Sequence, residues 1–318
     1  MSLQNLIEKI VHHGEVEIPT ITPRTLPESS AQNPLIRTTE IIGEGGMSKV
    51  YVGEFNGKKV AIKVPLLLRD GNEELVLHTF EEELSFLRQH QGETSQFNMA
   101  ELGIPFNSDL STYDTTVSVA VGFATPINEA MPEKFDPKVG IVTDYVGGKQ
   151  LFSTRTSRSG DEVMSINNEI PLKFQLAAII GWVRVLSQLT QSGIIAMDNN
   201  IDTDLLLDID TSQSGHRHGS HVNLNITRID TTIASSPSES YDQLIEIIQA
   251  CFGKSSNALS ATALAPFGDY LRQEFDHGNI KTIIDFERKI KEGLAMVDWQ
   301  HPELNSVELI KMRKLMRE

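Results

Sequence analysis

The chain has 318 residues, of which 39% are hydrophobic, and this is enough for one large domain or for two lobes. Acidic residues outnumber basic residues by 43 to 28, which gives a formal net charge of −15. A general nucleic-acid binder needs cations that displace phosphate counterions, so this composition argues against that class. It also disfavours binding to anionic membrane surfaces.

Cysteine usage and hydropathy limit the cellular context. Cys251 is the single cysteine, so an intramolecular disulfide framework and cysteine-based zinc sites are excluded. No run of 18 apolar residues predicts a membrane-spanning helix, and the N-terminus lacks the pattern of a secretory signal. We therefore expect a soluble protein of a reducing compartment such as the cytoplasm.

The first residues are interpreted as an N-terminal extension, 1–37. Apolar residues recur at helical spacing over 3–11 and predict a short helix. The prolines between 18 and 34 predict an extended linker. Two interpretations of the helix stay open: it docks on the body of the protein, or it binds a partner or directs targeting.

The next segment has the pattern of β-strands from residue 35 to about 64. The Asn56-Gly57 pair predicts a tight hairpin turn between two of these strands. A helix is expected over 72–90. Residues 92–137 are polar and weakly patterned, apart from a predicted strand over 115–122.

The remaining chain is richer in helix. A strand is expected over 140–145, a polar loop over 153–168 and a long apolar helix over 171–192. Short strands are predicted at about 194–196, 205–209 and 222–229. The final helices are expected at 241–252, about 258–274, 279–296 and 303–317. The sequence therefore predicts an α+β protein.

The strongest motif is a glycine-rich turn, G-x-G-x-x-S, between two predicted strands. Such a turn lets backbone N–H groups approach a polyphosphate without obstruction by side chains. Lys63 follows Val50 by 13 residues in an Ala-Ile-Lys strand. This combination resembles the N-lobe of eukaryotic-type protein kinases. The resemblance implies an ATP site with Lys63 and these residues: Gly43, Glu44, Gly45, Gly46, Ser48, Val50 and Ala61.

The predicted helix that follows carries the pattern F-x-x-E-x-x-x-L, with Glu83 at the acidic position. In the kinase family this carboxylate pairs with the strand lysine and holds it toward the nucleotide phosphates, which implies a Lys63–Glu83 pair. A solvated acidic helix face is the interpretation for Glu81 and Glu82. For Glu83 the same interpretation stays open as an alternative.

The segment Val142–Leu151 resembles the strand and hinge that hold adenine in this family. The resemblance implies that Thr143 is the gatekeeper. It also implies that Asp144 and Val146 offer backbone hydrogen bonds to adenine.

The catalytic loop of the family corresponds to the residues after the long apolar helix. Asp198 is the candidate base that orients a substrate hydroxyl. The family's histidine and arginine are replaced by Ala196 and Met197, and its lysine is replaced by Asn200. These departures put catalysis in doubt, although the aspartate is retained.

Two metal ligands are implied by the same resemblance. Asp230 stands where the family has Asp-Phe-Gly, with Thr231 and Thr232 in place of the last two residues. The other ligand is Asp204 if one residue is inserted, or Thr203 if none is. We favour Asp204, because a carboxylate is a hard oxygen ligand suited to Mg²⁺.

A further departure concerns the substrate. Asp242, which opens a predicted helix, follows Asp230 by only 12 residues, where protein kinases have a longer activation segment. Little chain remains to dock a peptide. Either the substrate binds elsewhere, or it is not a protein, or there is no substrate.

The resemblance implies a bilobal protein-kinase-like fold. Its β-rich N-lobe covers 38–146, with an insertion near 92–137, and its helical C-lobe covers 147–318. The implied cofactors are ATP and Mg²⁺, and the implied reaction is transfer of the γ-phosphate to a protein or another hydroxyl acceptor. Two alternatives stay open: a pseudokinase that binds nucleotide or scaffolds a protein partner, and a small-molecule kinase. Delivery into a host cell as a secreted effector is an analogy without support in the sequence.

Overall fold

The computed structural model describes residues 35–44, 47–66, 73–105, 114–156, 162–166, 170–193, 205–213, 219–231 and 263–305, and single positions between 242 and 248. The chain is an α+β protein, as predicted. Its elements in chain order are β1 (Ile36–Glu44), β2 (Ser48–Phe55), β3 (Lys58–Pro65), α2 (Glu73–Gln89), β4 (Thr94–Asn98), β5 (Asp114–Phe123), η2 (Asn128–Ala130), β6 (Ile141–Asp144), β7 (Lys149–Gln150), β8 (Phe152–Thr156), β9 (Glu162–Ile166), α3 (Leu172–Gln191), β10 (Leu205–Gln213), β11 (Gly219–Arg228), α6 (Ala265–Asp276), α7 (Ile283–Leu294) and α8 (Pro302–Asn305).

The first sheet is antiparallel, with the strand order β1-β2-β3-β6. The predicted hairpin between β2 and β3 is confirmed. Asn56 and Gly57 both have positive φ, at 53° and 76°, as the central positions of a type I′ turn require. This turn sets the register that brings Lys63 opposite Val50.

Helix α2 covers the first sheet with the apolar residues of its inward face. The first core contains Val60 and Ile62 of β3, Phe80 and Leu84 of α2, and Val142 of β6. The helix starts with two glutamates, whose charges suit the positive end of the helix dipole. Burial of these apolar side chains fixes α2 against β3.

The second sheet joins segments that are far apart in the sequence. Its strand order is β4-β5-β11-β10-β7. β5 and β11 pair in parallel from Asp114 opposite Gly219 to Phe123 opposite Arg228. The segment near 92–137, interpreted from the sequence as an insertion in the first lobe, thus supplies two strands to the second sheet.

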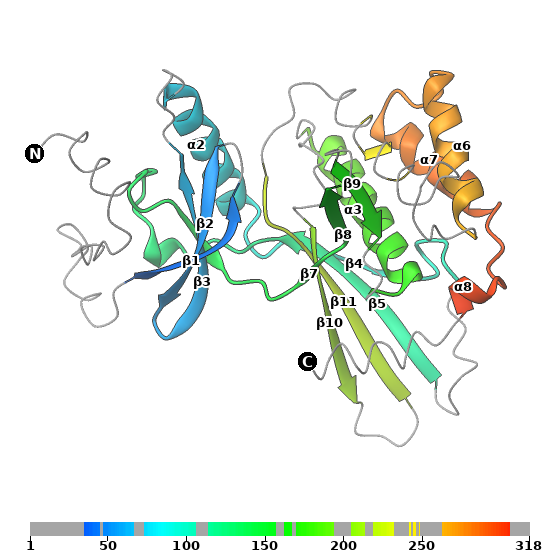
Figure 1. Ribbon diagram of the computed structural model, residues 1–318, viewed down its shortest axis with the longest axis horizontal. Helices are drawn as coiled ribbons and strands as arrows, with labels where there is room; N and C mark the ends of the chain where they lie inside the picture. The colour runs from blue at the N-terminus through cyan, green and yellow to red at the C-terminus, as the bar shows by residue number, and fades with distance from the viewer. Residues whose placement is uncertain are drawn as a thin grey trace, which may run out of the picture.

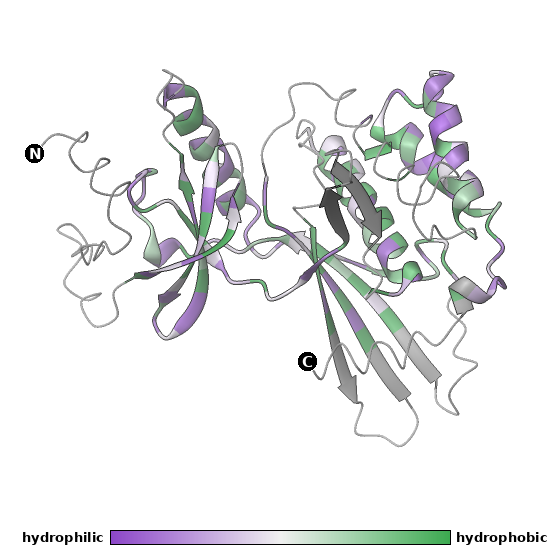
Figure 2. Cartoon of the chain, viewed as in Figure 1, coloured by the Kyte–Doolittle hydropathy of each residue, from purple (hydrophilic) through white to green (hydrophobic). Residues whose placement is uncertain are grey.

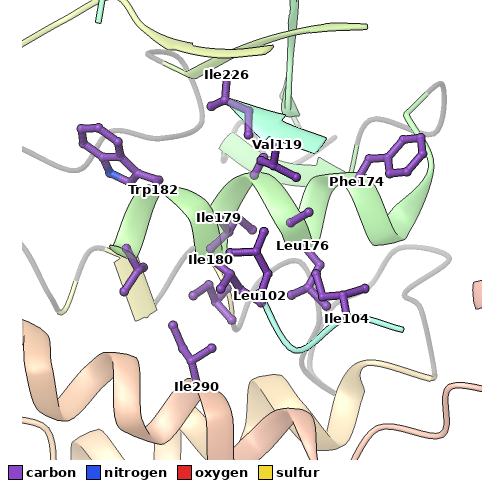
Figure 3. Packing of buried hydrophobic residues seen from close by; sticks show 14 of the residues in the cluster. Leu102, Ile104, Val119, Phe174, Leu176, Ile179, Ile180, Trp182, Ile226 and Ile290 are labelled. Carbon is purple, nitrogen blue, oxygen red and sulfur yellow. The ribbon is translucent and has the colours of Figure 1, made fainter. Parts of the chain in front are cut away.

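Helix α3 is the centre of the second core. Figure 3 shows Val119 of β5 and Ile226 of β11 on one side of the helix and Ile290 of α7 on the other. Trp182 and Phe174 on α3 are fully buried. Because the helix is covered from both sides, most of its residues are apolar and most are buried, as expected of the long apolar helix predicted over 171–192.

The elements form two groups in space. Figure 1 shows β1, β2, β3 and α2 together on the left, and α3, α6, α7 and the second sheet on the right. In Figure 2, α6 and α7 carry both hydrophobic and hydrophilic stretches, as expected of helices that cover a core with one face. Asp242 forms an ion pair with Arg272 of α6, at 3.1 Å.

Several sequence predictions differ from the structure. The polar loop expected over 153–168 is wrong, because β8 and β9 pair there as an antiparallel hairpin. β4 was not predicted. β10 and β11 are longer than the strands predicted at about 205–209 and 222–229, because β10 continues to Gln213 and β11 begins at Gly219. Predictions for 1–34, for 194–196 and for the end of the last helix lie outside the described residues.

Among the described residues, no helix is long and apolar enough to cross a membrane.

Candidate functional site

A cleft is lined by residues of both sheets. One wall comes from the first sheet and α2, and the other from β10 and the segment after β11. The lining residues are Ile42, Val50, Ala61, Lys63, Glu83, Leu87, Ile141, Thr143, Asp144, Tyr145, Val146, Leu206 and Ile229.

Three ionisable side chains meet at this cleft. The Lys63 ammonium lies 3.0 and 2.9 Å from the two carboxylate oxygens of Glu83. It lies 2.9 Å from the nearer carboxylate oxygen of Asp230. β3, α2 and the segment after β11 each supply one of these residues, so the predicted Lys63–Glu83 contact is present and Asp230 joins it. We call these three residues the charged triad.

The charged triad is unevenly buried. The side chains of Glu83, Lys63 and Asp230 are 2%, 12% and 29% exposed. Two carboxylates around one ammonium leave an excess negative charge when all three groups are ionised. Glu83 is the most buried member of the triad and Asp230 is the most exposed. Lys63 and Glu83 line the cleft, and Asp230 lies beside it, next to the lining residue Ile229.

Burial and charge act on the pKa values of the triad in different ways. Burial alone would lower the pKa of Lys63, but the charges of Glu83 and Asp230 outweigh it and hold that pKa well above its ordinary value. Burial raises the pKa of Glu83, the charge of Asp230 adds to this, and Lys63 only partly opposes it. Lys63 is therefore cationic. The unfavourable feature of the site is the excess negative charge of two carboxylates beside one ammonium.

Asp230 is held in place by its neighbours in the chain. The backbone N–H of Thr231 donates a hydrogen bond to the Glu83 carboxylate. The Thr231 side chain is buried. The segment after β11 thus contacts α2 directly.

Both walls of the cleft carry apolar side chains. Val50, Ala61 and Ile42 belong to the first sheet, and Leu206 and Ile229 belong to the second group of elements. At one edge, Val146 lies in the connection between β6 and β7, and its backbone makes no hydrogen bond to the described part of the chain. A flat aromatic ring fits between such walls, and a free backbone edge can recognise it.

The charged triad offers groups that can bind both an anion and a cation. A fixed ammonium can bind an anionic group such as a phosphate. The partly exposed carboxylate of Asp230 is a hard oxygen ligand, and a divalent cation there would offset the excess negative charge. The cleft thus combines an apolar slot with groups for an anion and for a hard cation.

The other residues predicted from the sequence are distributed as follows. Gly43 pairs with Val50 across β1 and β2, and Glu44 forms an ion pair with Lys49 at 3.0 Å. Ser48 begins β2 and lies opposite Pro65. Predicted residues outside the described part of the chain are Gly45, Gly46, Asp198, Thr203 and Asp204.

Some lining residues were not predicted. Leu206 and Ile229 close the cleft from the side opposite Val50. The sequence carries a partial signal for Ile229, because it directly precedes Asp230. Leu206 lies in an apolar run, and the pattern alone does not show that it is only partly buried at the cleft.

Within the described part of the chain, no group of three or more histidine, cysteine, aspartate or glutamate side chains is arranged to hold a metal ion. In comparison with known proteins, the chain matches no protein family, and no curated protein is significantly similar to it.

Proposed function

We propose that this chain is a divergent protein-kinase-like protein that binds Mg²⁺-ATP and transfers the γ-phosphate to a hydroxyl acceptor. In this proposal the two groups of elements are the N-lobe and the C-lobe of a bilobal kinase fold. The observation that carries it is the charged triad, because α2 and the segment after β11 bring the carboxylates of Glu83 and Asp230 within 3.0 Å of the Lys63 ammonium on β3.

The residues of the cleft fit the nucleotide by chemistry. Val50, Ala61 and Leu206 are apolar lining residues that would hold an adenine ring, and the backbone of Val146 would bind its polar edge. Lys63 binds the phosphates and Glu83 orients Lys63.

The charge balance at Asp230 fits Mg²⁺. The excess negative charge of the triad and the exposure of Asp230 suit a cation at this carboxylate. When bound, Mg²⁺ neutralises the phosphate charge, and ATP supplies the phosphoryl group. The chain's own residues position and neutralise, which is most of what phosphoryl transfer requires.

A second candidate is a pseudokinase that binds nucleotide without transferring phosphate. The favouring observation is that Asp230 already uses a carboxylate oxygen on Lys63. Ala196, Met197 and Asn200, which replace the family's residues around Asp198, also favour a pseudokinase.

For the enzyme, the acceptor is a protein or a small molecule. The short stretch between Asp230 and Asp242 favours a small acceptor.

One experiment separates these candidates. The protein is incubated with Mg²⁺ and γ-labelled ATP, and label transfer and thermal stabilisation are measured separately for wild type and Asp230→Ala. Asp208→Ala is a matched control, because Asp208 lies exposed on β10 outside the cleft lining. The enzyme predicts that Asp230→Ala loses transfer by about 100-fold or more, while Asp208→Ala retains it.

The other outcomes are equally decisive. Stabilisation by ATP without transfer supports the pseudokinase. At a ligand concentration of 100 Kd, stabilisation should reach about 2.7 kcal/mol. A folded protein that no nucleotide stabilises contradicts the nucleotide site.

A further inference from the structure

Arg228, the last residue of β11, is a charged side chain inside the second core. It is 0% exposed. Leu224 and Ile226 precede it on the same inward face of the strand, where an apolar residue would satisfy the packing. Because a buried guanidinium is costly unless it makes directed contacts, those contacts indicate its role.

The contacts of Arg228 lead to Asp230. Its side-chain Nε donates a hydrogen bond to the backbone carbonyl of Asp230. Its guanidinium carbon lies 5.3 Å from the centre of the Trp182 ring, within the range of a cation–π interaction. The carbonyl of Arg228 itself accepts a hydrogen bond from the N–H of Ala124, at 2.9 Å. Both the main chain and the side chain of Arg228 are thereby fixed.

The Trp182 platform is itself anchored. Trp182 is fully buried on α3, and Phe123 of β5 meets it edge-on at 5.9 Å. Phe86 of α2 meets Phe123 in the same way at 5.0 Å. α2 also carries Glu83, so one series of contacts connects both ends of the charged triad.

We propose that Arg228, supported by Trp182, is a positioning residue that holds the Asp230 carboxylate at Lys63 by fixing the Asp230 backbone. Arg228 acts through Asp230 and does not line the cleft. Its role in metal and nucleotide binding rests on the function proposed above. Its role in holding the segment 229–231 does not.

The first measurement uses no nucleotide. Hydrogen exchange of the Thr231 amide, which donates to Glu83, reports how firmly the segment after β11 is held. In Arg228→Met this amide should exchange about tenfold faster or more, because the directed bond to Asp230 is lost. Amides of α7 should be unchanged. Arg228→Lys retains the charge but not the forked donor, so it should restore part of the protection.

Arg184→Met is the matched control. Arg184 lies on the same helix as Trp182 and also contacts an aromatic ring, that of Phe97, but it pairs with Glu287 of α7. Its removal should leave Thr231 exchange as in wild type.

The second measurement is the ratio of nucleotide Kd values without and with Mg²⁺. In Arg228→Met this ratio should fall about 10- to 100-fold toward that of Asp230→Ala, as expected when a residue that orients a metal ligand is removed. Nucleotide binding without Mg²⁺ should stay close to wild type, whereas a general structural defect would weaken both.

Unchanged Thr231 exchange in folded Arg228→Met overturns the proposal. If Arg228→Met does not fold, Arg228→Lys provides the test. Thr231 exchange equal to wild type in Arg228→Lys would then overturn the proposal, because it would show that the guanidinium is not needed to hold this segment. A wild type that binds no nucleotide contradicts the proposed function, while the exchange comparison still decides the role of Arg228.

Discussion

The two hydrophobic cores of this protein differ in size and in where charged side chains lie. The first core, between α2 and the sheet β1-β2-β3-β6, carries Lys63 and Glu83 at its edge. The second core is larger, is built around α3, and is dominated by aliphatic and aromatic side chains. Apolar packing stabilises without direction, whereas buried charges require specific partners. We therefore expect substitutions of apolar side chains in either core to affect stability, and substitutions of the charged side chains Lys63, Glu83 and Arg228 to affect the cleft.

The largest effect is expected in the second core. Phe286 on α7 is 0% exposed, and Phe286→Ala should lower the free energy of unfolding by about 3–5 kcal/mol. Ile284 on the same helix is 54% exposed, so Ile284→Ala should change it by no more than about 0.5 kcal/mol. Urea unfolding measures both. Similar losses for the two variants would refute the assigned packing of α7.

A smaller effect, tied to the cleft, is expected at Gly140. This residue has φ of 79°, and a Cβ there would lie 2.3 Å from the carbonyl oxygen of Lys63. Gly57 has a similar φ of 76°, but a Cβ there meets nothing within 4 Å. Gly57→Ala should cost about 1–2 kcal/mol of backbone strain. Gly140→Ala should cost more in urea unfolding and should also weaken nucleotide binding, because it displaces Lys63. Equal costs with unchanged binding would show that β6 does not constrain Lys63.

The smallest effect concerns pH. Burial raises the pKa of Glu83 above its ordinary value of 4.5, so its carboxylate binds a proton more tightly in the folded than in the unfolded chain. The stability of wild type relative to Glu83→Gln should therefore fall as the pH rises from 4.5 through the raised pKa. The slope should not exceed about 1.4 kcal/mol per pH unit. Urea unfolding of both proteins at several pH values tests this, and a difference that grows with pH would reverse the assignment.

Local patterns predicted much of the fold. The Asn56-Gly57 turn, α2 and α3 follow from turn chemistry and from apolar periodicity within single segments. The partner of β5 did not follow, because its alternating apolar pattern suits any sheet with one buried face, and β11 lies far along the chain. The β8–β9 hairpin was missed because its residues are mostly polar.

The candidate site was predictable where a motif fixes the spacing. Lys63, Glu83 and Asp230 were all named from the sequence, and the structure brings them together. Arg228 was not named, although its signal was present: it continues the inward alternation of Leu224 and Ile226 with a charged residue. Its bond to Asp230 depends on the turn of the chain after β11, which periodicity does not describe.

The parallel pairing of β5 with β11 has a consequence for the order of folding. The hairpin of β2 and β3 joins neighbouring residues, so it can form as soon as that part of the chain leaves the ribosome. The β5–β11 pair can form only after Gly219, the partner of Asp114, has been synthesised. Closing so long a loop is slow. Asp230 lies just beyond β11, so Lys63 and Glu83 can meet before Asp230 reaches them, and the cleft is completed late in synthesis.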